Sequence, residues 1–200
     1  EGLLEKILKD TYRVCDFDNI YLELTKMPIK NIVTTNIDDL VDRIYGSKES
    51  KIRISDSKIY GTLEKENMVN LFKLHGSVTY PLGEKMSFTE KELTDLFIRD
   101  KGLFESVTYK LAACPTIFWG TSLQDSNTLE LISNSAVFAK NNMPKWIVVY
   151  PDEENRNLIE DFEELGFYII EADTKDLIIH LSKQSFTRHD DDHVYIYKKY

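Results

Sequence analysis

Apolar and polar residues follow one another along the chain in short blocks, and the spacing of these blocks predicts strands and helices in turn. The runs KNIVTT and NLFKL lack the strict alternation of a half-exposed strand. Short continuous runs of this kind are typical of strands that are buried on both faces of a parallel sheet. The predicted strands cover residues 29–35, 69–74, 116–119, 146–150 and 167–170.

Segments with helical spacing lie before, between and after these strands. The predicted helices cover residues 3–8, 20–24, 38–45, 88–111, 129–138, 158–165 and 176–181. Gly46 and Gly166 end two of them, and Gly102 is expected to divide the long one. Residues 52–60 alternate in a polar setting, which predicts a small hairpin or an exposed insert.

Strands and helices alternate at spacings that fit crossover connections, which predicts an α/β fold with a doubly wound, mostly parallel, Rossmann-like sheet. We expect a helical lead-in over residues 1–28, the α/β domain over 29–184, and an acidic loop and strand over 185–200. Ligands of such sheets bind at the carboxyl ends of the strands. Functional residues are therefore expected there.

Composition and charge exclude or disfavour several classes of structure and function. The 200 residues are 42% hydrophobic and 30% charged, which excludes disorder of the whole chain. The net charge of −9 disfavours direct binding to nucleic acids or anionic membranes. Two cysteines, Cys15 and Cys114, exclude a disulfide framework and a four-cysteine zinc site. No signal peptide opens the chain, so a reducing, cytoplasmic location is expected.

Polar residues gather directly after four of the predicted strands. The candidates are Asn36, Asp38, His75, Thr121, Ser122 and Asp173. Histidine titrates near neutral pH and is the usual general base, but a histidine before a glycine can equally be structural, and both interpretations stay open for His75. Asn36 and Asp38 fit a helix N-cap as well as a ligand site, and these two roles are compatible.

Three segments in order carry a family resemblance: TTNID (34–38), KLHG (73–76) and GTSL (120–123). Together they resemble the NAD-binding fold of sirtuins, and most of all the bacterial sirtuin-like domains of antiphage defence systems, which hydrolyse NAD+. The segment EADTKDL (171–177) is similar to the last nucleotide-binding turn of that family. The resemblance extends from about residue 29 to 180.

The resemblance implies a site, a substrate and partners. Asn36 would hold the nicotinamide ribose and orient a water molecule, and His75 would act as the general base. The residues implied in nucleotide binding are Thr35, Asp38, Gly120, Thr121, Ser122 and Asp173. The substrate would be NAD+, with no metal. The protein would act as a homo-oligomer or fused to further domains, as an antiviral effector in bacteria.

Two features depart from the family pattern. The family's glycine-rich first turn is absent, and no Gly-x-Gly occurs in the chain, so we expect a first βα unit to precede it. The paired CxxC zinc ligands of protein-deacylating sirtuins are also absent, which predicts a domain without a zinc module. Two hypotheses follow from the resemblance: an NAD+ glycohydrolase, or a catalytically incomplete module that binds ADP-ribose-type nucleotides or acts in assembly. A third, an unrelated α/β domain, remains if the three motifs do not converge in space.

The segment HDDDH at 189–193 is a last candidate. Histidine and carboxylate side chains are divalent-metal ligands, so a metal site is one interpretation. The alternative, which we favour, is a solvated acidic loop before the strand-like VYIYKKY.

Overall fold

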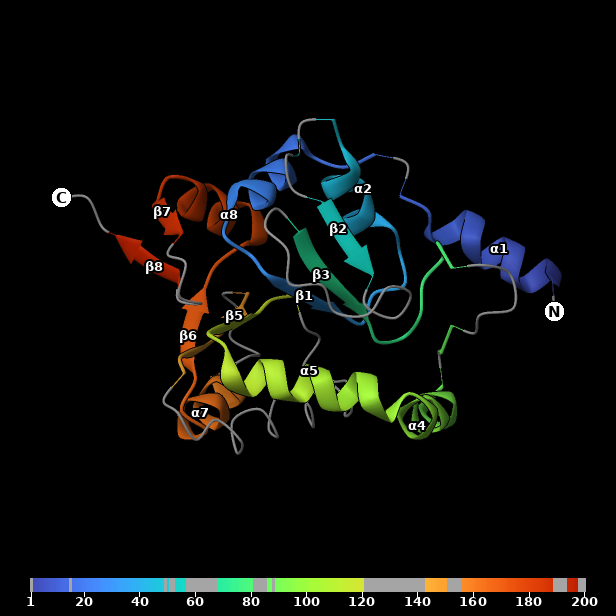
Figure 1. Ribbon diagram of the computed structural model, residues 1–200. Coiled ribbons are helices and arrows are strands. Elements are labelled where there is room, and N and C mark those ends of the chain that lie inside the picture. Colours follow the sequence, from blue (N-terminus) through green and yellow to red (C-terminus); the bar gives the residue numbers. More distant parts are fainter. Residues whose placement is uncertain are drawn as a thin grey trace. The chain divides into compact units, whose positions relative to one another are not determined.

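Figure 1 shows the computed structural model of the chain. The structure describes residues 2–14, 16–48, 50, 53–56, 68–80, 86–87, 89–120, 143–150, 156–188 and 194–197. The chain divides into two compact units, one of residues 1–101 with 178–200 and the other of residues 102–177. Each unit has a three-stranded parallel sheet of its own.

The first unit is built on the sheet β1-β3-β2, in which β3 is central (Figure 1). Its elements are α1 (Gly2–Tyr12), the 3-10 helix η1 (Asn19–Lys26), β1 (Asn31–Thr34), α2 (Leu40–Gly46), β2 (Arg53–Asp56), β3 (Met68–Lys73) and α4 (Glu90–Arg99). The antiparallel pair β7 (Ser185–Arg188) and β8 (Val194–Tyr197) also belongs to it.

Helix α2 packs on the first sheet through its last turn. Ile44 and Tyr45 lie against Val69 of β3, and all three are at most 2% exposed. The Tyr45 hydroxyl donates to the carbonyl of Leu24 at 3.4 Å, and burial raises the pKa of this phenol to about 12. These contacts hold the last turn of α2 against β3 and against the end of η1.

The second unit is built on the sheet β4-β5-β6. Its elements are α5 (Lys101–Ala113), β4 (Thr116–Phe118), β5 (Lys145–Val149), α7 (Arg156–Glu164), β6 (Tyr168–Glu171) and the first turns of α8 (Thr174–Ser182). The ring of Phe167 makes edge-to-face contacts with the rings of Phe118 and of Phe162 in α7. The ring centroids are 5.7 Å and 5.5 Å apart, respectively. These rings hold α7 to the strands.

The structure confirms an α/β fold with parallel strands, and all five predicted strands are present as β1, β3, β4, β5 and β6. The predicted end of α7 at Gly166 is also confirmed, since the helix ends at Glu164 and Gly166 has φ 84° in the turn that follows. The doubly wound arrangement stays a prediction. The predicted helix over 129–138 lies outside the described residues.

Residues 53–56 form β2, which pairs in parallel with β3, so these two strands are not the arms of a hairpin, which are antiparallel. The other interpretation of residues 52–60, an exposed insert, stays a prediction. One prediction of local structure is wrong. The long predicted helix is divided at Asp100, not at Gly102, because Gly102 lies in the first turn of α5, where a glycine is tolerated. No helix in the described part of the chain is both long and apolar enough to cross a membrane.

Candidate functional site

Asn36 and His75 follow neighbouring parallel strands in matching register. Thr34 of β1 is paired with Lys73 of β3, and each candidate lies two residues beyond its paired residue. The backbone continues this pairing, because the Leu74 N–H donates to the Thr34 carbonyl at 2.9 Å. Asn36 and His75 therefore lie at the same edge of the sheet, on adjacent loops.

A second backbone bond ties these two loops beyond the candidate residues. The Val78 N–H donates to the Ile37 carbonyl at 2.9 Å. Ile37 and Val78 are buried in one apolar cluster with Met86. The loops are thus joined on both sides of the positions of Asn36 and His75.

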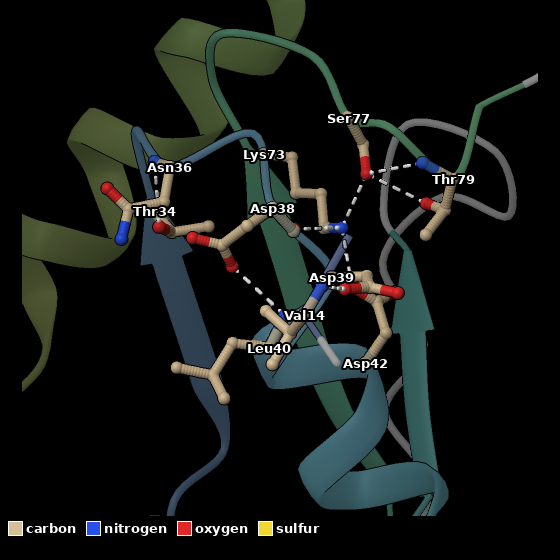
Figure 2. Close-up of polar contacts among 10 residues, drawn as sticks. All are labelled: Val14, Thr34, Asn36, Asp38, Asp39, Leu40, Asp42, Lys73, Ser77 and Thr79. Atoms are coloured by element: carbon tan, nitrogen blue, oxygen red, sulfur yellow. Dashed lines mark hydrogen bonds and ion pairs between the residues drawn. The ribbon is translucent and has the colours of Figure 1, made fainter. Parts of the chain in front are cut away.

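The loop after β1 is shaped by short side chains that accept backbone N–H groups (Figure 2). The Asn36 N–H donates to Thr34 Oγ1 at 3.0 Å, and Asn36 itself is exposed, whereas Thr35 is half-buried. The Leu40 N–H donates to Asp38 Oδ1 at 3.0 Å, a turn that leads into α2. Asp38 therefore shapes the turn before α2, but the N-cap residue is Asp39, so the interpretation of Asn36 and Asp38 as N-caps is wrong.

Asp39 directly precedes α2, but its carboxylate accepts a hydrogen bond from the segment after α1. The Val14 N–H donates to Asp39 Oδ1 at 2.7 Å, so the residues after α1 are tied to the β1–α2 loop (Figure 2).

His75 is half-buried and is followed by a turn that requires glycine. Gly76 is buried and has φ 89°, a conformation that L-residues rarely adopt. The Ser87 N–H donates to the His75 carbonyl at 2.9 Å, which fixes the histidine backbone from the other side.

A polar cluster lies beneath this edge (Figure 2). It is formed by the buried Lys73 and Ser77, the half-buried Asp42 and the exposed Thr79. Lys73 is the last residue of β3 and is only 2% exposed. Its Nζ contacts Asp42 Oδ2 at 2.5 Å, Ser77 Oγ at 2.6 Å and the Asp38 carbonyl at 3.3 Å. Sequence reasoning missed this cluster, although a lysine inside the run NLFKL was its signal.

The second unit contains two more of the predicted site residues, Gly120 and Asp173. Gly120 comes after β4 with φ 66°, and Asp173 comes after β6. Asp173 Oδ1 accepts the Lys175 N–H at 2.8 Å, which caps the start of α8. Both residues lie at the carboxyl ends of strands of one parallel sheet. Thr121 and Ser122 lie outside the described residues.

The Trp119 indole also reaches this end of the second sheet, since its Nε1–H donates to Thr174 Oγ1 at 3.2 Å. Lys145 lies at the opposite, amino end of β5, where its Nζ donates to the Cys114 carbonyl at 2.8 Å. Burial lowers the pKa of Lys145, and the neighbouring Cys114 acts in the other direction. Lys145 therefore lies at the end of the sheet opposite the predicted ligand site.

Among the residues that the structure describes, no group of three histidine, cysteine, aspartate or glutamate side chains could hold a metal ion. The candidate segment at 189–193 lies outside that part of the chain. Asn36 and His75 bring an amide and an imidazole to the loops after β1 and β3. Such groups orient a water molecule, accept its proton and bind hydroxyl groups.

A family model described as the SIR2-like domain matches residues 30–170 of the chain. This range includes Asn36, His75 and Gly120 and ends before Asp173. No curated protein matches the chain.

Proposed function

Because the chain belongs to the SIR2-like domain family, which indicates an NAD-related function, we propose that it hydrolyses NAD+ to nicotinamide and ADP-ribose. The observation that supports this most is the matching register of Asn36 and His75 on adjacent parallel strands. An amide and an imidazole on neighbouring loops suit a reaction in which water is the only nucleophile.

In the proposed reaction, water attacks C1′ of the nicotinamide ribose. The bond from C1′ to the pyridine nitrogen breaks, its electron pair returns to that nitrogen, and neutral nicotinamide leaves. His75 accepts the proton from water and passes it to solvent, which leaves ADP-ribose. Asn36 both donates and accepts hydrogen bonds, so it can hold a ribose hydroxyl and the attacking water together.

The family resemblance supports further proposed contacts with the other parts of NAD+. Thr35 and Asp38 would lie toward the nicotinamide side. Gly120, Thr121 and Ser122 would bind the ribose and diphosphate, and Asp173 the adenine end. Gly120 has a positive φ, which glycine adopts without strain, and its lack of a side chain lets a ligand approach the backbone closely. Both features support the proposed binding of the diphosphate at Gly120.

A second candidate function is nucleotide binding without turnover, or a role in assembly. It is favoured by the glycine spacing, since none of the eight glycines forms a Gly-x-Gly turn. Such a turn presents several backbone N–H groups to a diphosphate. A module without it would bind ADP-ribose-type nucleotides more weakly.

The segments TTNID, KLHG and GTSL resemble the sirtuin-like domains of antiphage defence systems, and this resemblance supports a proposal about the biological role of the protein. We propose a cytoplasmic antiphage effector in a bacterium that acts as a homo-oligomer or fused to further domains. The α/β domain would span residues 29–184, between a helical lead-in and a C-terminal segment.

The proposal is tested by NAD+ hydrolysis and ADP-ribose titration with two variants. His75→Ala is expected to lower kcat by about 10²–10⁴-fold, the usual contribution of a general base, with ADP-ribose affinity largely unchanged. Asn36→Ala is expected to lower kcat similarly and to weaken binding.

His180→Ala is the matched control, because His180 is an exposed histidine in the last turn of α8. It should hydrolyse NAD+ at the wild-type rate. Nicotinamide release at the wild-type rate by His75→Ala would contradict the proposed role of this residue. Nucleotide binding without nicotinamide release by the wild type would favour the second candidate function.

A further inference from the structure

Lys73 is a charged residue at the buried end of the largely apolar strand β3. Its side chain is 1% exposed, and β3 around it consists of buried residues such as Leu71 and Phe72. Burying an ammonium group costs free energy unless it is fully hydrogen-bonded. Three acceptors satisfy the three hydrogens of the Lys73 ammonium: the Asp38 carbonyl, Asp42 Oδ2 and Ser77 Oγ.

These acceptors belong to three different segments of the chain. Asp38 lies in the loop after β1, Asp42 lies in the first turn of α2, and Ser77 lies in the loop after β3. The two loops are those that carry Asn36 and His75. A single ammonium group therefore connects both candidate loops to the helix that follows β1 (Figure 2).

The cluster extends through Ser77 to Thr79. Ser77 Oγ accepts hydrogen bonds from Lys73 Nζ at 2.6 Å and from the Thr79 N–H at 3.1 Å. Because both lone pairs of the oxygen are then used, the Ser77 hydroxyl donates its own hydrogen to Thr79 Oγ1, 2.8 Å away. The loop after His75 is thus fixed by side chains as well as by its backbone.

A serine beside a lysine also resembles a nucleophile with its base, but the geometry argues against that role. Ser77 is 1% exposed, so a substrate cannot reach its hydroxyl. The Lys73 ammonium donates to three acceptors and has no lone pair with which to take a proton. The cluster is part of the support of the site.

A purely structural role explains the cluster poorly. Buried ion pairs are weak stabilisers, and replacing both partners by apolar residues is often neutral or stabilising. The ion pair does, however, hold its partners in one geometry. We propose that Lys73 is a positioning residue, which keeps the loops of Asn36 and His75 at the separation that the proposed hydrolysis of NAD+ requires.

The test compares two variants of the full chain with a matched control. Lys73→Met removes the charge and leaves Asp42 without its ammonium partner, so it also destabilises the fold. The double variant Lys73→Met/Asp42→Leu removes both charges and is expected to unfold at a urea concentration close to that of the wild type. Lys26→Met is the control, because Lys26 forms an exposed ion pair with Glu23 at 2.6 Å.

Two measurements are made on each protein: the kcat and KM of NAD+ hydrolysis, and amide hydrogen exchange at Leu74 and Val78. These two N–H groups form the bonds between the loops. In the double variant we expect kcat to fall by about 10²-fold, since small misplacements of reacting groups cost this much, with KM changed far less. Exchange at Val78 is expected to be about tenfold faster than in the wild type.

The outcomes separate this inference from the proposed function on which it rests. A double variant with wild-type kcat and wild-type exchange would overturn the positioning role and leave the proposed function intact. A wild type that releases no nicotinamide would overturn the proposed function, and exchange at Val78 would then decide the positioning role alone. Faster exchange in the double variant, with no change in Lys26→Met, supports it.

Discussion

At the scale of single residues, Gly76 determines how the chain leaves β3 directly after His75. Its φ of 89° is unfavourable for a residue with a Cβ atom. We predict that Gly76→Ala lowers the free energy of unfolding by about 1–2 kcal/mol, measured by urea denaturation.

Gly46→Ala is the control for this prediction. Gly46 ends α2, its φ is not positive, and a Cβ atom there would meet nothing within 4 Å. It should leave stability unchanged or raise it by up to about 1 kcal/mol. Equal effects of the two substitutions would contradict the argument from backbone conformation.

Tyr45 makes stability depend on alkaline pH. Burial raises its pKa from 10.0 to about 12, so the folded protein keeps the phenolic proton where the unfolded chain loses it. This contribution to the free energy of unfolding is fully present below pH 10 and is lost as pH rises toward 12, by about 3 kcal/mol in total. Urea denaturation between pH 8 and pH 11 measures the onset of this loss.

Phenylalanine substitutions identify the residue responsible. Tyr45→Phe should remove this part of the pH dependence, whereas Tyr109→Phe should not, because Tyr109 is 74% exposed. If both variants keep the same loss of stability above pH 10 as the wild type, then Tyr45 is not its source.

At the scale of elements, α1 and the residues after it support both candidate loops. Leu8 packs against the apolar cluster of Ile37, Val78 and Met86, and Lys9 Nζ donates to the Tyr80 carbonyl at 2.7 Å. We predict that Leu8→Ala lowers the free energy of unfolding by about 1–3 kcal/mol, because Leu8 is partly buried.

Leu3→Ala on the same helix is the control, since Leu3 is 74% exposed. Its effect should stay within about 0.5 kcal/mol. Thermal or urea unfolding of the two variants side by side measures the difference, and an equal loss in both would show that α1 contributes only through its helix propensity.

The elements that the sequence predicts well are those with a strong local pattern. The continuous apolar runs of β1 and β3 identify strands whatever surrounds them, and polar residues after them mark the strand ends. The pairing of β2 with β3 depends on tertiary contacts, so a polar alternating segment gave no sign of a parallel partner.

The candidate site shows the same difference between local and distant signals. Asn36, Asp38 and His75 are found from their positions after strands. Lys73 is missed because charged residues are rarely buried, and its carboxylate partner Asp42 lies 31 positions away in the chain. No local pattern joins two such residues before the fold is known.

At the scale of the whole molecule, the net charge of −9 acts on any anionic substrate that approaches. NAD+ also carries a net negative charge, so its long-range interaction with the protein is repulsive. Raising ionic strength from about 10 mM to about 150 mM shortens the Debye length from roughly 30 to 8 Å and should lower the KM for NAD+, by less than about threefold. A KM that rises with salt would instead indicate a local basic surface around the site.

The products of NAD+ hydrolysis distinguish an enzyme from a module that only binds nucleotides. The full chain is incubated with NAD+, and nicotinamide and ADP-ribose are measured by chromatography over time, with His75→Ala beside the wild type. We predict that the wild type releases both products in equal amounts and that His75→Ala releases them at least about 10²-fold more slowly. Intact NAD+ after prolonged incubation with the wild-type protein, or equal rates for the two proteins, would contradict the account.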